Sequence, residues 1–181
     1  VIELGASGPG EIARLTEIAG PRIGVLTAIG SAHLEGFGSI DGVMRAKAEL
    51  IAGLGRNGIA VLNGDDARVQ LIGEAARCGV LWYGTRAGTY GLYARGKNIE
   101  TAGETTWFRL DGGRLIKLAA PGRHQVYAAL AAIVIGRWTG MADREIAAGL
   151  ENYRPAAMRC QVERLGGVTV INDAYNASPP S

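Results

Sequence analysis

Cysteine is scarce in this chain of 181 residues, which contains only Cys78 and Cys160. Two thiols so far apart exclude a small disulfide-stapled scaffold, and we expect both to be reduced in a cytoplasmic protein. The chain also lacks an excess of charge of one sign, because its net charge is +2 and no run of Lys or Arg forms a stripe. This balance argues against a nucleic-acid partner.

Long apolar runs are absent too. The longest, Ala128 to Ile135, is far shorter than the ~20 residues that span a bilayer, so we expect no membrane partner. A signal peptide and an initiator methionine are missing, and the chain opens on Val1-Ile2-Glu3-Leu4 as if inside a buried strand. We therefore expect a fragment of a longer protein.

The residues that are present indicate an α/β fold. The chain is 48% hydrophobic and has 28 glycines, which is typical of a globular protein with many tight turns. Apolar runs predict strands at 1–4, 23–29, 59–62 and 80–83. Amphipathic segments between them predict helices over 11–19, 40–54 and 66–77. The strands are almost wholly apolar, which favours a doubly wound, mostly parallel sheet.

The pattern changes near residue 87. From 89 to 119, short β-prone runs alternate with glycine turns, including a hairpin at Asp111-Gly112-Gly113, and predict a small antiparallel addition. Helices are expected over 123–138 and 143–150, and Tyr153-Arg154-Pro155 is a plausible domain boundary. Another strand is expected from Val168 onward.

Polar residues follow several predicted strands, where doubly wound sheets bind ligands. Glu3 lies within the first strand near its end, His33 follows the second, and Asn63, Asp65 and Asp66 follow the third. A carboxylate and an imidazole at adjacent strand ends can share a divalent cation with phosphate oxygens. Taken singly, each is more often a solvated or structural residue, so only their convergence favours a site.

Lys47 is unusual because it lies inside a predicted helix between Ala46 and Ala48. One interpretation is a lysine that packs its stem on apolar surface and extends its amine into water. The other is a neutral amine that takes up CO2, since the resulting carbamate is an anion able to bind a cation.

Two common motifs do not fit the N-terminal segment. Ser7 lacks the glycine two positions later that a nucleophile elbow needs, and Gly5 and Gly8 miss the spacing of a dinucleotide fingerprint. His124 is expected at a helix start, either as a first-turn residue or near a nucleotide. Arg159 suits phosphate, and Asp173 suits ribose hydroxyls or a cation.

Several segments together resemble one enzyme family. They are Glu3-Leu4-Gly5-Ala6, Ala32-His33-Leu34-Glu35-Gly36-Phe37-Gly38-Ser39, Ala46-Lys47, Asn63-Gly64-Asp65-Asp66, Pro121-Gly122-Arg123-His124 and Asp173-Ala174-Tyr175-Asn176-Ala177. In this order and spacing they resemble the Mur ligase family, most closely the branch that adds D-alanyl-D-alanine. The resemblance covers essentially the whole chain.

The resemblance implies a P-loop-type central ATPase domain over residues 1–157 and the start of a C-terminal domain over 158–181. The implied activity is ATP-dependent joining of D-alanyl-D-alanine to UDP-N-acetylmuramoyl-tripeptide through an acyl phosphate, in a cytoplasmic monomer that makes peptidoglycan precursors. It assigns Mg2+ to Glu3, His33 and Lys47, with His33 and a carbamylated Lys47 catalytic. It assigns ATP contacts to the residues Asn63, His124, Arg159, Asp173 and Asn176.

The sequence also departs from the family pattern. The Gly-Lys-Thr phosphate loop expected upstream of Glu3 is not in the chain, and Ala28, Gln125 and Ala128 replace frequent Asn residues. Two rivals therefore stay open. One is a non-catalytic binding module of the same fold, and the other is a sister ligase that adds glutamate to folate.

Overall fold

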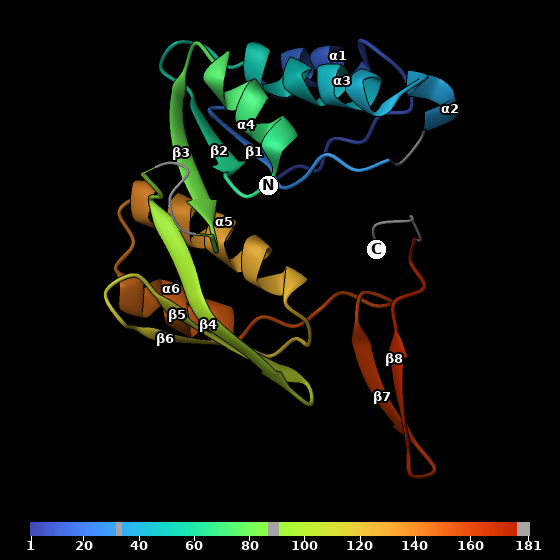
Figure 1. The fold of residues 1–181 in the computed structure, drawn as a ribbon, viewed down its shortest axis with the longest axis vertical. Coiled ribbons are helices and arrows are strands. Elements are labelled where there is room, and N and C mark those ends of the chain that lie inside the picture. The colour runs from blue at the N-terminus through green and yellow to red at the C-terminus, as the bar shows by residue number, and fades with distance from the viewer. Residues whose placement is uncertain (32–33, 87–90, 177–181) are drawn as a thin grey trace. The chain divides into compact units, whose positions relative to one another are not determined.

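The computed structural model describes residues 1–31, 34–86 and 91–176. The chain forms two compact units, Val1–Tyr93 and Ala94–Ala177, whose elements are drawn in Figure 1. None of the helices in these described ranges is long and apolar enough to cross a membrane.

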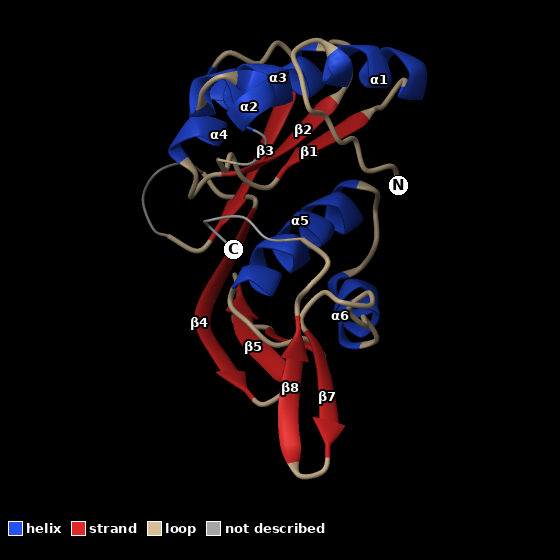
Figure 2. Cartoon of the chain, turned by 90° about the vertical axis from the view of Figure 1, so that its right-hand side faces the viewer, coloured by secondary structure: helices blue, strands red, loops and turns tan. Residues whose placement is uncertain are grey.

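Unit 1 is a parallel sheet covered by helices. Its strands are β1 (Ile23–Leu26), β2 (Ile59–Asn63) and β3 (Gly79–Gly84), and β2 pairs in parallel with both neighbours. Its helices are α1 (Glu11–Ala19), α2 (Leu34–Phe37), α3 (Ile40–Ala52) and α4 (Ala67–Glu74). The helices lie over one face of these strands (Figures 1 and 2). Apolar side chains from α3 and α4 pack on this face and form the core.

The strand predictions for unit 1 are confirmed for three strands and wrong for one. In β2, Ala60, Val61 and Leu62 are buried, as expected for a central parallel strand. Val1–Leu4, however, is not a strand, and Val1 and Ile2 are exposed. An apolar run becomes a strand only through a backbone ladder, and no described residue pairs with this segment. Glu3 therefore lies in a loop.

Unit 2 contains the predicted antiparallel strands. They are β4 (Ala94–Ala102), β5 (Thr105–Leu110) and β6 (Leu115–Leu118), followed by the helices α5 (His124–Trp138) and α6 (Asp143–Glu151). Gly96 of β4 lets the sheet approach α5, because a Cβ there would crowd Val126, Leu130 and Phe108. The predicted α/β class is thus confirmed, with the parallel strands in unit 1 and the antiparallel strands in unit 2.

Unit 2 also contains a separate two-stranded sheet, the hairpin of β7 (Gln161–Leu165) and β8 (Val168–Asn172). β8 was expected, but β7 was not, because its polar residues hide the alternation. The turn residues Gly166 and Gly167 have φ of 55° and 85°, and this two-residue glycine turn was the available signal. The boundary after residue 157 stays a prediction.

Candidate functional site

The carboxyl ends of the three parallel strands are tied together by side chains. Asn63, at the end of β2, donates from Nδ2 to the Thr27 carbonyl oxygen beyond β1 at 2.8 Å. Its Oδ1 accepts from the Asp65 N–H at 2.9 Å. Tyr83 of β3 is fully buried, and its hydroxyl donates to the Leu26 carbonyl oxygen at 3.3 Å. The fold therefore uses the Asn63 side chain to hold β1 against β2.

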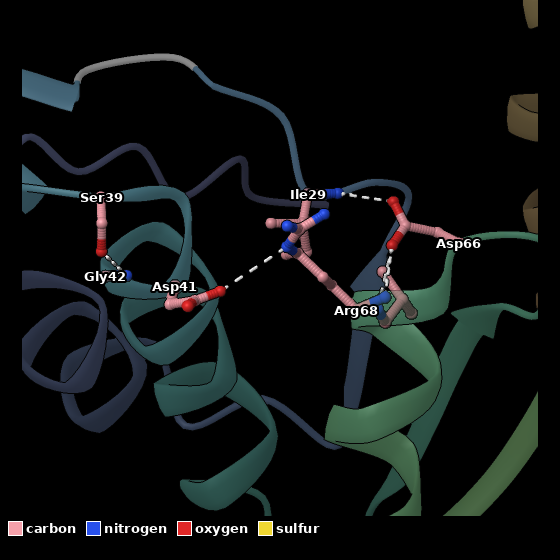
Figure 3. A network of polar contacts seen from close by, with 7 residues as sticks. Ile29, Ser39, Asp41, Gly42, Asp66 and Arg68 are labelled. Carbon is pink, nitrogen blue, oxygen red and sulfur yellow. Dashed lines mark hydrogen bonds and ion pairs between the residues drawn. The ribbon is translucent and has the colours of Figure 1, made fainter.

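Both carboxylates of the turn after β2 are also engaged. Asp66 caps α4 by accepting from the N–H groups of Arg68 and Val69, and its other oxygen accepts from the Ile29 N–H at 2.9 Å (Figure 3). Asp65 accepts from the N–H and the hydroxyl of Thr85 at 2.7 and 2.8 Å. These two carboxylates fix the loops after β1 and β3.

The helix starts beside this turn are linked as well. The Ser39 hydroxyl oxygen caps α3 by accepting from the Gly42 N–H at 3.1 Å. Asp41, in the first turn of α3, faces Arg68 in the first turn of α4, with 3.8 Å between Nε and Oδ1 (Figure 3). The N-termini of α3 and α4 are thus each capped by a side-chain oxygen, from Ser39 and Asp66.

A cavity of about 290 Å³ lies beyond the carboxyl end of β1. Its lining comes from the N-terminal loop, from α1, α2 and α3, and from the segment after β1: Glu3, Leu4, Gly5, Ala6, Ile12, Ala28, Gly30, Phe37, Val43, Ala46 and Lys47. The structure thereby brings Glu3 and Lys47, which are far apart in sequence, to one mostly apolar cavity. Lys47 is half-buried and Glu3 is exposed.

The donor chemistry of this cavity fits Mg2+ in part. Mg2+ is commonly held by one or two carboxylates together with phosphate oxygens and water, and Glu3 supplies one carboxylate. Within the described ranges no cluster of three or more His, Cys, Asp and Glu side chains could enclose a metal ion. Further ligands would come from water, from phosphate, from a carbamate on Lys47, or from His33, which lies outside the described residues.

Four of the residues predicted to contact nucleotide gather in unit 2. His124 begins α5, and its Nε2 lies 3.4 Å from the Cys160 Sγ. The Cys160 N–H donates to Asp173 Oδ1 at 3.0 Å. Burial, and next the Asp173 carboxylate, raise the pKa of the Cys160 thiol, so this cysteine is a neutral packing group at neutral pH.

Arg159 and Asn176 complete the cluster. The guanidinium of Arg159 lies over the Tyr175 ring, 3.9 Å from its centroid, and Asn176 follows this tyrosine. The Tyr175 N–H donates to the Met158 carbonyl oxygen at 3.2 Å, which joins the segment before β7 to the segment after β8. Residues from three separate parts of the sequence therefore meet here.

Three residues of these regions were not predicted: Cys160, Tyr175 and Glu49, whose carboxylate bonds to the backbone of α1. Tyr175 lies within the motif Asp173-Ala174-Tyr175-Asn176-Ala177, which was an available signal. Cys160 has a φ of 50° and Glu49 bonds across 36 and 39 residues, and neither property leaves a local pattern in the sequence.

Comparison with known proteins gives the family of this fold. The model of the Mur ligase middle domain matches residues 1–136. The chain is 36% identical over its whole length to UDP-N-acetylmuramoyl-tripeptide–D-alanyl-D-alanine ligase of Bacillus subtilis, covering 39% of that protein. It is 33% identical over 98% of its length to the ligase of the same name from Escherichia coli, covering 40% of it.

Solved structures agree with the sequence matches. The crystal structure of MurF from Acinetobacter baumannii superposes with a TM-score of 0.90 at 31% identity, over 99% of this chain and 40% of that one. MurF ligase from Thermotoga maritima in complex with ADP gives 0.84 at 30% identity, over 98% of this chain and 41% of that one. This chain thus spans about two fifths of the proteins that it matches, and it belongs to the Mur ligase family.

Proposed function

We propose that the full-length protein is an ATP-dependent amide-bond ligase that joins D-alanyl-D-alanine to UDP-N-acetylmuramoyl-tripeptide in peptidoglycan precursor synthesis. The observation that carries the proposal is the pairing of Glu3 and Lys47 on one cavity at the carboxyl end of β1. Relatives that carry this activity in their names match the chain from end to end, which supports the same substrates.

The reaction has two steps. The tripeptide carboxylate attacks the γ-phosphorus of ATP, which forms an acyl phosphate and releases ADP. The amine of D-alanyl-D-alanine then attacks the acyl carbon, forms the amide and expels inorganic phosphate. Because little covalent chemistry falls to the protein, its residues act by positioning the reactants and balancing charge.

Glu3 and Lys47 are proposed to hold Mg2+ together with His33. When bound, Mg2+ neutralises negative charge on the transferring phosphate. An ammonium on Lys47 would repel the ion, whereas a carbamate formed with CO2 would attract it. Phe37 and Val43 line the same cavity beside Lys47.

The polar cluster of unit 2 is proposed to contact ATP. Arg159 suits a phosphate, Asp173 suits ribose hydroxyls, and His124 and Asn176 lie beside them. Asn63 is proposed for the same nucleotide, although its side chain already bonds to Thr27 and Asp65. A change of Asn63 would therefore affect the strand ends as well as the nucleotide.

The remaining expectations belong to the same proposal. Residues 1–157 form the central ATPase domain and residues 158–181 begin the C-terminal domain. Ser39 and Asp66 cap α3 and α4, so the N–H groups that these caps engage are not available to the triphosphate. The protein is proposed to act as a cytoplasmic monomer.

Substrate-dependent ADP release tests this function. The purified full-length protein should release ADP only when UDP-N-acetylmuramoyl-tripeptide and D-alanyl-D-alanine are both supplied with MgATP. Omission of either substrate is the internal control. Turnover with folate and glutamate instead would assign the chain to the sister ligase, and no turnover with any pair would favour the binding module.

A further inference from the structure

One carboxylate joins two walls of the cavity. Glu49, on α3, accepts from the Gly10 N–H through Oε1 at 2.8 Å and from the Ala13 N–H through Oε2 at 2.9 Å. Gly10 is the N-cap of α1 and has no side chain to cap the helix itself. The N-cap and the third helical residue are the two positions that a capping box satisfies, and here a single distant side chain satisfies both.

The position of Glu49 connects this cap to the cavity. Lys47 precedes it by two residues on the same helix, and both Lys47 and Glu3 line the cavity. The loop that carries Glu3 runs directly into α1. Glu49 therefore joins the first turn of α1, and with it the end of the loop that carries Glu3, to α3, the helix of Lys47.

Two other contacts involve Ser7 of this loop. The Ser7 N–H donates to Glu11 Oε2 at 2.8 Å, within the same segment. Gly36 packs directly against the Ser7 carbonyl oxygen, where a Cβ would collide with it. Residues 1–6 form no strand, and the Glu49 carboxylate links α1 to the helix of Lys47 by two hydrogen bonds.

We propose that Glu49 is a positioning residue, which sets the distance between Glu3 and Lys47 by capping α1. The inference rests on the proposed function, in which Glu3 and Lys47 hold Mg2+. It predicts that the cap affects how tightly Mg2+ binds, and not only how stable α1 is. Residues next to metal ligands commonly change metal affinity in this indirect way.

The test uses the full-length protein with Glu49→Ala and Glu49→Gln. The alanine variant loses both acceptors, while glutamine keeps one carbonyl oxygen and much of the shape, so it preserves the test if alanine prevents folding. The Mg2+ concentration for half-maximal activity should rise about 10-fold or more in Glu49→Ala and less in Glu49→Gln. The KM for D-alanyl-D-alanine should change less than about 2-fold if the cap acts through the Mg2+ site alone.

Hydrogen exchange supplies a readout without metal or turnover. In the metal-free protein, the Gly10 and Ala13 amides should exchange faster in both variants, together with the loop of residues 3–8. Glu17→Gln is the matched control, because Glu17 also carries a carboxylate on this helix pair but, among the described residues, bonds only to Arg14. The control should leave both the exchange and the Mg2+ requirement unchanged.

The outcomes separate the two proposals. If Glu49→Ala speeds amide exchange but leaves the Mg2+ requirement unchanged, the cap is only structural and the inference is overturned. If Glu3→Gln itself leaves the Mg2+ requirement unchanged, the metal role in the proposed function fails, and this inference fails with it. A raised Mg2+ requirement in both Glu3→Gln and Glu49→Ala, with an unchanged control, supports both.

Discussion

Two groups of polar residues lie near the carboxyl ends of the strands of unit 1, and their side chains are used differently. The side chains of the first group, Asn63, Asp65 and Asp66, make hydrogen bonds that join loops and strands. Glu3 and Lys47 line a cavity, and neither side chain has a hydrogen bond or ion pair with another described residue. The first group builds the edge of the sheet, and the second is available for a ligand.

This difference shows that a polar residue at the end of a strand can be either structural or available to a ligand. The carboxyl edge of a parallel sheet collects polar residues, partly because the loops there need hydrogen-bond partners. A side chain that is held by hydrogen bonds within the protein is less free to turn toward a ligand, and its removal also removes those bonds. We therefore expect substitutions in the Asn63–Asp66 turn to lower stability, and substitutions of Glu3 or Lys47 to lower activity with little loss of stability.

The largest effect should come from Lys47. Lys47→Ala in the full-length ligase should reduce kcat by about 100-fold or more, because it removes a group proposed to hold Mg2+ at the transferring phosphate. The melting temperature should change little, and added bicarbonate should not restore activity, since no amine remains to take up CO2. Arg45→Ala, on the exposed side of the same helix, is the control. Full activity in Lys47→Ala would show that this lysine has no role in the reaction.

Asp66 tests the other side of the comparison. Asp66→Ala removes the cap of α4 and the acceptor for Ile29, so the free energy of unfolding should fall by about 2–3 kcal/mol. Urea denaturation measures this change. Asp41→Ala also removes a carboxylate from the first turn of a helix, but its ion pair is exposed, so the loss should stay below about 0.5 kcal/mol. Equal losses in the two variants would contradict the distinction drawn here.

Tyr175 extends the comparison to unit 2. Its ring lies under Arg159, so Tyr175→Leu should release the guanidinium and raise the KM for ATP about 3- to 10-fold, with a smaller change in kcat. Tyr175→Phe keeps the ring and should behave like the wild type. Tyr153→Leu, at another exposed tyrosine, is the control. Equal KM values for Tyr175→Leu and Tyr175→Phe would show that the ring does not position Arg159.

The smallest effect concerns a carboxylate of unit 2 that is fully engaged. Hydrogen bonds from Arg137 to both Asp143 oxygens, each at 2.8 Å, lower the pKa of Asp143. A lowered folded-state pKa gives stability that is present above the unfolded value near 4 and is lost as the pH falls through the folded value. Asp143→Asn should therefore cost up to about 1 kcal/mol at pH 7 and less near pH 3, measured by urea denaturation. A cost that does not vary with pH would show that shape, and not charge, holds this pair.

Much of the fold follows from local pattern. Apolar runs located β1, β2 and β3, and the Asp111-Gly112-Gly113 turn located the hairpin of β5 and β6. The Val1–Leu4 prediction is wrong because apolar content does not supply a partner strand. β7 was missed because its residues alternate weakly, although the glycine turn beside it was visible.

The candidate site was less predictable. Residue type and position indicated Glu3 and Lys47, and the structure places them on one cavity. The sequence could not show that Asn63 and Asp66 are already engaged, because their partners Thr27 and Ile29 lie more than 30 residues away. Glu49 was missed for the same reason. Long-range hydrogen bonds decide which polar residues stay available, and they have no local periodicity.

The contact between Gly36 and the Ser7 carbonyl oxygen bears on how this segment can vary among functional sequences. A library of all substitutions at position 36 should retain only glycine, because any side chain would push the Ser7 backbone and move the loop that carries Glu3. Position 38 is also glycine, with a φ of 72°, but open space surrounds it, so asparagine should be accepted there. Two glycines two residues apart should thus show opposite tolerance, one limited by space and the other by backbone conformation.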